Sequence, residues 1–198
     1  MRIMVLFTIG HSTHPLDRFL DLVAQHGIEM VADIRRFPGS RQHPQFNQET
    51  LAATLQATGV EYRWFEALGG RRCKTTTASS NLGLRNESFR NYADYMLTAE
   101  FRSEVGELLK IGRRKRTAFM CSEGLFWRCH RRLVSDFLLM KGITVQHIMP
   151  TGELQRHQLT KEARIDDGAV IYPPPAANPS QLLLPFNARH QSGQNEGI

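Results

Sequence analysis

One rhythm occurs three times along this chain and restricts the folds open to it: an amphipathic run, then a glycine, then a short apolar segment. The three copies are residues 15–34, 47–65 and 131–149. In the first copy, Leu16, Phe19 and Val23 recur with the spacing of one helical face. Pro15 stands near the first helical position and Gly27 follows the last. The rhythm predicts helices that end at a glycine and lead into strands.

Five apolar segments are predicted to be strands. They are residues 4–10, 30–32, 62–65, 116–121 and 145–148. Strands that alternate with helices form right-handed βαβ units, and such units build a mostly parallel sheet. We therefore predict a three-layer α/β domain over residues 1–172, with about five strands and helices on both faces of the sheet.

Composition narrows the class of protein. The chain has 198 residues, which suits one domain, and no apolar run approaches the roughly 20 residues of a membrane span. Its three cysteines are an odd number without framework spacing, as expected for reduced thiols in a cytoplasmic protein. The net charge of +6 favours an anionic partner such as nucleic acid. We expect a cytoplasmic protein without a membrane partner.

Two polar segments interrupt the rhythm. Residues 69–88 have almost no apolar periodicity and predict a long mobile loop, which in a compact domain often forms a lid. The basic run at residues 112–116 lies at a helix-to-strand turn, and we interpret it as a solvated charge cluster.

Polar residues follow the ends of four predicted strands. In an open parallel sheet, ligands bind at the carboxyl ends of the strands, so these segments are expected to meet in one cleft. The residues predicted to bind an anionic substrate there are His11, Ser12, Arg35, Ser40, Arg41 and Arg131. An ion-pair network that orders the loops is the alternative interpretation.

The segment from 120 to 132 holds two cysteines, a glutamate and a histidine. Cys121 ends a strand, and a helix beginning near Trp127 would favour its thiolate; an inert buried thiol is equally consistent with the pattern. Cys129 falls on the apolar face of that helix and is assigned to the core. His130 is expected to point inward and meet Glu123 or Asp33 for proton transfer.

The predicted catalytic residues are therefore Cys121, Glu123, His130 and Asp33. A zinc site on Cys121, Cys129 and His130 is not expected, because the spacing lacks the closely spaced ligand pair of most zinc sites. A cysteine-phosphatase loop is not expected either, because Arg128 stands seven rather than six positions after Cys121. No metal and no cofactor are predicted.

These motifs, in this order, resemble the domain of unknown function 488 family, which is widespread in bacteria and archaea. The matching segments are TIGHS at 8–12, DIRRFPGSR at 33–41, PQFN at 44–47, LGG at 68–70, MCSE at 120–123, CHRR at 129–132 and HIM at 147–149. The resemblance extends to about residue 172. It implies a cytosolic α/β domain whose shared polar residues form a cluster, and it implies no activity.

The last segment, residues 173–198, changes character. A polyproline start and a polar remainder predict a disordered tail. Its one apolar cluster, residues 181–186, is similar to the hexapeptide that binds the bacterial sliding clamp. The predicted partner-binding residues are Gln181, Leu182, Leu184 and Phe186. The alternative is that this segment packs on its own domain.

Together these features predict a nucleic-acid-associated enzyme with an anion-binding cleft. Two other functions are consistent with the sequence. One is a non-catalytic module that binds nucleic acid and is recruited through its tail. The other is an enzyme that acts on a small molecule and has no role at DNA.

Overall fold

The computed structural model describes residues 4–74, 76 and 78–175 of the chain. Six strands form one sheet in the order β3-β2-β4-β1-β5-β6. They are β1 (Val5–Gly10), β2 (Met30–Asp33), β3 (Glu61–Trp64), β4 (Thr117–Cys121), β5 (Thr144–Ile148) and β6 (Leu154–Arg156). The first five are parallel, which confirms the predicted sheet, and β6 adds an antiparallel edge strand that was not predicted.

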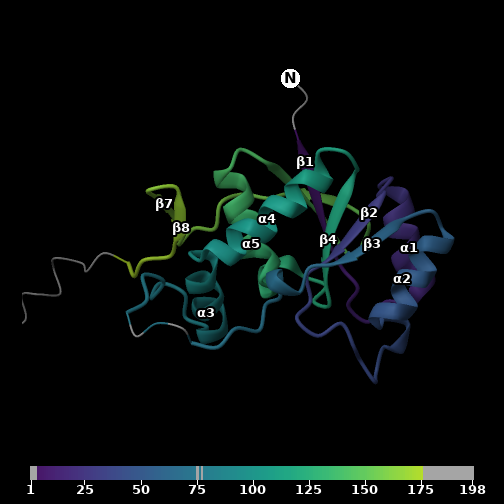
Figure 1. Ribbon diagram of the computed structural model, residues 1–198, viewed down its shortest axis with the longest axis horizontal. Coiled ribbons are helices and arrows are strands. Elements are labelled where there is room, and N and C mark those ends of the chain that lie inside the picture. The colour runs from purple at the N-terminus through teal and green to yellow at the C-terminus, as the bar shows by residue number, and fades with distance from the viewer. Residues whose placement is uncertain (1–3, 75, 77, 176–198) are drawn as a thin grey trace, which may run out of the picture.

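Helices cover both faces of this sheet (Figure 1). They are α1 (Leu16–Gln25), α2 (Gln48–Ala57), α3 (Glu87–Met96), α4 (Ala99–Gly112) and α5 (Arg131–Met140). Side chains of α1 and α2 pack in one hydrophobic core, and those of α3, α4 and α5 pack in the other. The layers are those of a three-layer α/β fold, as predicted.

Three glycines end helices in the predicted way. Gly27, Gly59 and Gly142 follow α1, α2 and α5 with φ angles of 57°, 80° and 75°. This left-handed conformation is open to glycine at little cost, and it reverses the chain into the next strand. The repeated glycine in the sequence therefore has a local structural cause.

The segment between Leu68 and α3 has no helix or strand among its described residues. Its middle is anchored nonetheless, because Asn81 and Leu84 are buried. The Asn81 side chain donates a hydrogen bond to Asp94 of α3 at 2.7 Å and accepts one from the Tyr172 amide at 2.9 Å. Closure of this segment as a lid stays a prediction.

A chain of buried polar side chains, here called the histidine chain, joins β1, β5 and α5. It consists of Thr8, His147, His157 and Asp136. The Asp136 carboxylate accepts from His157 Nε2 at 2.9 Å, and His147 Nε2 then donates to His157 Nδ1 at 3.0 Å. The Thr8 hydroxyl donates to His147 Nδ1 at 2.7 Å. Every ring nitrogen in the chain has a protein partner.

The Asp136 carboxylate also anchors a two-stranded hairpin, which consists of β7 (Arg164–Asp166) and β8 (Ala169–Ile171). Tyr172, which follows β8, donates its hydroxyl to Asp136 at 2.7 Å.

Within residues 4–74, 76 and 78–175, no helix is both long and apolar enough to cross a bilayer. The tail residues Gln181, Leu182, Leu184 and Phe186 lie outside the described residues, so clamp binding stays a prediction.

Candidate active site

A cleft of about 640 Å³ opens at the carboxyl ends of β1, β2 and β4. This is the edge of the sheet at which the sequence predicts a site. The predicted residues that line it are His11, Ser12, Arg35, Ser40, Cys121, Glu123 and His130. Asp33, Arg41 and Arg131 do not line it.

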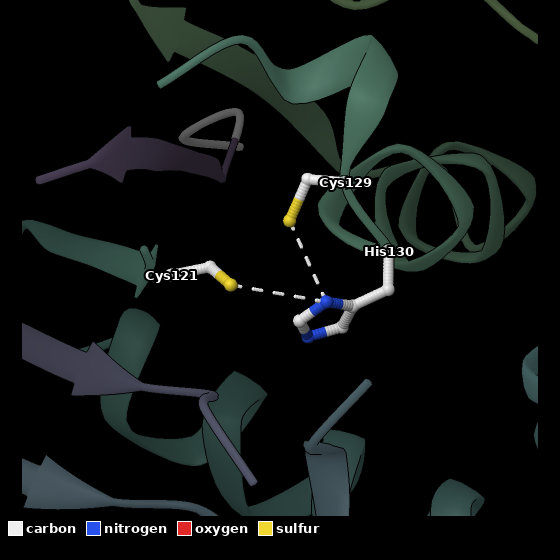
Figure 2. A group of neighbouring side chains, drawn as sticks. All are labelled: Cys121, Cys129 and His130. Carbon is white, nitrogen blue, oxygen red and sulfur yellow. Dashed lines mark hydrogen bonds between the residues drawn. The ribbon is translucent and has the colours of Figure 1, made fainter. Parts of the chain in front are cut away.

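The floor of the cleft holds Cys121, Cys129 and His130, here called the thiol–imidazole cluster (Figure 2). His130 Nδ1 lies 3.9 Å from the sulfur of Cys121 and 3.5 Å from that of Cys129. His130 Nε2 lies 3.0 Å from the Ile34 carbonyl oxygen, which can only accept, so the proton of the neutral ring is on Nε2. The lone pair of Nδ1 therefore faces the two sulfur atoms.

The two cysteines do not separate as predicted. Cys129 is buried in the hydrophobic core, as expected, but its sulfur also belongs to the cluster. The helix that was predicted to begin near Trp127 begins at Arg131 instead, because residues 126–128 form a 3-10 turn and Cys129 is extended. The positive end of α5 therefore acts on the Cys129 sulfur, to which the Arg131 amide donates.

The pKa values of the two thiols shift in opposite directions. Burial alone would raise the pKa of Cys129, but hydrogen bonds from the Cys121 thiol and from Arg131, together with the Arg131 charge, lower it to about 6. The hydrogen bond to Cys129 and burial raise the pKa of Cys121 to about 12. Cys129 is thus the sulfur that carries the first negative charge.

Arg131 was predicted to hold an anionic substrate, and the structure places it elsewhere. Its side chain is 1% exposed, and its guanidinium donates to the carbonyls of Glu123 and Gly124. No carboxylate among the described residues pairs with it. A buried cation needs a nearby negative charge, and the neighbouring Cys129 sulfur can supply it.

Asp33 and Arg35 form the ion-pair network left open as the alternative interpretation. Their side chains contact at 2.5 Å, and both are buried. The Asp33 carboxylate also accepts from the Tyr62 hydroxyl at 2.7 Å, and burial with this contact raises the pKa of Tyr62. Asp33 is fully hydrogen-bonded, has no exposed surface and fixes the Arg35 side chain; a role in proton transfer stays a prediction.

His11 completes this network. Its Nδ1 donates to the Ser12 carbonyl at 2.9 Å, which leaves Nε2 to accept from Arg35 at 3.4 Å. Its ring also stacks on Phe46 with centroids 4.2 Å apart. Burial and the Arg35 charge lower the pKa of His11 to about 4. Both ring nitrogens are thus engaged within the protein, and binding of an anion by His11 stays a prediction.

The predicted pairing of His130 with Glu123 or Asp33 is wrong. His130 is held by the Ile34 carbonyl instead, since the start of α5 packs across the end of β2. The Glu123 carboxylate lines the cleft and accepts a hydrogen bond of 3.4 Å from the Leu125 amide. Glu123 thus stays available as an acid–base group.

Three arginines that line the cleft were not among the predicted anion-binding residues. Arg36, Arg71 and Arg128 line the cleft, whereas the predicted Arg41 is exposed outside it. Arg36 pairs with Glu66 at 3.0 Å, but none of the ion pairs among the described residues includes Arg71 or Arg128. Each missed arginine stands beside a residue or motif that was already singled out, which is the signal that could have found it.

Two glycines are required by close approaches in the site. A Cβ on Gly70 would lie 2.4 Å from His130 Nδ1, and one on Gly10 would lie 1.9 Å from the Glu123 carbonyl oxygen. Both positions must therefore lack a side chain. Gly70 in particular allows the backbone to pack closely against the His130 ring.

Comparison with known proteins gives a family without an activity. The family model described as domain of unknown function DUF488 matches residues 15–138, from the start of α1 to within α5. The matched range contains all three members of the thiol–imidazole cluster. A search of curated proteins and a search of solved structures found no match. By this match, which spans more than half of its length, the chain belongs to the DUF488 family.

Proposed function

We propose that this protein is an enzyme that acts on nucleic acid, with the phosphate backbone held by the cleft arginines and the reaction centred on the thiol–imidazole cluster. The observation that carries the proposal is the joint position of these groups. Cys121, Cys129 and His130 lie in the floor of the same cleft that Arg71 and Arg128 line. A reactive centre and anion-binding groups within one cleft are typical of an active site.

The choice of a nucleic acid rests on charge and on one aromatic side chain. Arg71 and Arg128 are exposed, and their guanidinium groups are suited to bidentate bonds with phosphate. Phe37 also lines the cleft and is 66% exposed, so a base can stack on its ring. Phosphate binding and base stacking are the two components of single-strand recognition.

His130 and Glu123 are the acid–base candidates. The unprotonated Nδ1 of His130 can accept a proton from a thiol or from a bound group, since its Nε2 is fixed by Ile34. Glu123 is partly buried at the same cleft and presents a carboxylate. Arg35 is compensated by Asp33 and therefore shapes the wall more than it adds free charge.

Salt-dependent binding tests the anion-binding half of the proposal. The affinity of the protein for a fluorescent single-stranded oligonucleotide would be measured by anisotropy over a range of salt concentrations. Replacing Arg71 or Arg128 with alanine should reduce the slope of log affinity against log salt by about 0.7 for each phosphate that the variant no longer neutralises.

The matched control lies at the opposite edge of the sheet. Arg113 and Arg114 are exposed residues that precede β4, and Arg113→Ala and Arg114→Ala remove the same charge there. These variants should keep the wild-type slope. A slope that falls equally in both pairs would mean that net charge, not the cleft, attracts the oligonucleotide.

Turnover separates the proposed enzyme from a non-catalytic binding module. Labelled DNA and RNA oligonucleotides would be incubated with the wild type and with Cys121→Ser, and the products analysed by mass spectrometry. Product formed only by the wild type supports the enzyme. Binding without product in either protein favours the module, and the absence of both leaves the small-molecule enzyme.

The tail supplies a separate prediction about location at DNA. Residues 181–186 of the sequence would bind a purified bacterial sliding clamp, and the double substitution of Gln181→Ala and Phe186→Ala would abolish binding. Titration of the clamp with the two tail peptides measures this. If the wild-type peptide does not bind, recruitment through the tail is excluded.

A further inference from the structure

We propose that Cys121, Cys129 and His130 bind a zinc ion whose fourth coordination position opens into the cleft. The inference deepens the proposed function, because it concerns the same cluster, and it rests on that function only for the use of the open position. Metal binding is measured without any substrate, so either proposal can fail while the other stands.

The geometry of the three donors fits zinc. Their ligand atoms all lie within 4.8 Å of one another, and His130 Nδ1 is 3.5 Å and 3.9 Å from the two sulfurs. A tetrahedral zinc ion with Zn–S of about 2.3 Å and Zn–N of about 2.0 Å separates its ligands by about 3.5–3.8 Å. Small side-chain rotations therefore bring all three donors onto one ion.

The surroundings of His130 also suit a ligand. Histidines that bind metal usually donate their other ring N–H to a carbonyl or carboxylate, which fixes the ring and its tautomer. His130 does this through Nε2 and the Ile34 carbonyl. Gly70 packs against the face of the ring near Nδ1, where a Cβ would clash, and so helps to hold the ring in this orientation.

Charge balance points in the same direction. Two thiolates and one neutral imidazole neutralise a divalent ion, and thiolate with imidazole is a donor set that zinc prefers. Arg131 is buried beside Cys129 without a carboxylate partner among the described residues, and a Cys129 thiolate ligand would balance it. The cluster is thus built to hold negative sulfur.

Three protein ligands leave one position open, as in catalytic rather than structural zinc sites. All three residues line the cleft, so we place the open coordination position on the cleft side of the ion, in the cleft that Arg71 and Arg128 also line. The sequence alone did not predict this site because the spacing between the cysteines is wide. The fold brings them together, since β4 ends where α5 begins in space (Figure 2).

Cobalt substitution tests the proposal on the full chain. Co²⁺ would be added to reduced, metal-free protein, and the visible d–d bands and the near-ultraviolet thiolate-to-cobalt charge-transfer band recorded. We expect one equivalent to give a tetrahedral spectrum, which one equivalent of Zn²⁺ then abolishes. Cys121→Ser and Cys129→Ser should each weaken binding by at least tenfold.

The matched control is the third cysteine. Cys73 is exposed and lies outside the cluster, so Cys73→Ser should keep the full spectrum. Gly70→Ala leaves every donor in place but crowds His130, and it should also weaken cobalt binding by at least tenfold while circular dichroism stays that of a folded protein.

Two results would overturn the proposal. The first is the absence of a thiolate–cobalt band in folded, reduced wild-type protein. The second is a band of equal strength in the wild type and in both cluster cysteine variants, which would place the metal elsewhere. Neither result bears on the salt-dependent binding of oligonucleotides, which tests the cleft separately.

Discussion

The histidine chain and the thiol–imidazole cluster both pack against α5, yet they differ in what their ring nitrogens meet. In the chain, His147 and His157 have protein partners at every nitrogen, at 2.7–3.0 Å. In the cluster, the partners of His130 Nδ1 among the described residues are two sulfur atoms, at 3.5 Å and 3.9 Å. The first arrangement is closed and stabilises the fold, whereas the second leaves a lone pair and two thiols for a ligand or a reaction.

Removing the end of the histidine chain should have the largest effect on stability. The Asp136 carboxylate accepts from His157, Tyr172 and the Thr160 amide. Asp136→Ala leaves these buried donors unpaired, and the free energy of unfolding should fall by about 3–5 kcal/mol. Urea denaturation measures this.

An exposed carboxylate provides the control for that variant. Asp166→Ala, in the β7–β8 hairpin, removes the same charge from the surface and should change the free energy of unfolding by less than about 0.5 kcal/mol. If Asp136→Ala lowers the free energy of unfolding no more than Asp166→Ala does, the histidine chain does not stabilise the fold.

His147 should make the stability of the histidine chain depend on pH in the acid range. Burial, followed by the charge of nearby groups, lowers the pKa of His147 to about 2, against 6.5 in the unfolded chain. Below pH 6.5 the unfolded state binds a proton that the folded state refuses, so stability falls as the pH falls. At pH 5 the loss is about 2 kcal/mol.

His147→Gln tests this dependence while keeping one donor and one acceptor. Glutamine does not titrate, so the variant should lose about 2 kcal/mol less than the wild type between pH 7 and pH 5 in urea denaturation. Equal losses in the two proteins would show that His147 is not held neutral.

Among the buried positions, the smallest effect on stability is expected in the thiol–imidazole cluster. Cys121→Ser replaces one small side chain with another of similar size, and the serine hydroxyl can still donate toward Cys129 and meet Ser122 and His130, which lie 3.9 Å from the Cys121 sulfur. The free energy of unfolding should change by less than about 1 kcal/mol, although oligonucleotide turnover should be abolished. Unfolding by several kcal/mol would assign the cluster to the fold instead of to chemistry.

The sequence predicted the sheet and its glycine-ended helices because both depend on local periodicity. Five predicted strands are parallel neighbours, and Gly27, Gly59 and Gly142 have the expected positive φ. The antiparallel β6 was missed, since its three exposed residues carry no apolar pattern. The apolar pattern of a sequence indicates which residues are buried, and an exposed edge strand such as β6 has few buried residues.

The place of the site was also predictable, but the partners of its side chains were not. Strand order alone brings Cys121 and His11 to one edge of the sheet. Which groups pair there depends on distances that no spacing rule contains. His130 binds the Ile34 carbonyl rather than Glu123, and Arg131 turns inward to the Glu123 and Gly124 carbonyls.

The most direct test of the comparison is a long-range ¹H–¹⁵N spectrum of the histidine rings, recorded before and after addition of one equivalent of Zn²⁺. We predict that His130 begins with its proton on Nε2 and that its Nδ1 resonance moves on zinc addition, while the ring nitrogens of His147 and His157 keep their shifts. A His130 Nδ1 that is protonated or unmoved, or a response from His147 or His157 in its place, would contradict the assignment of an open cluster and a closed chain.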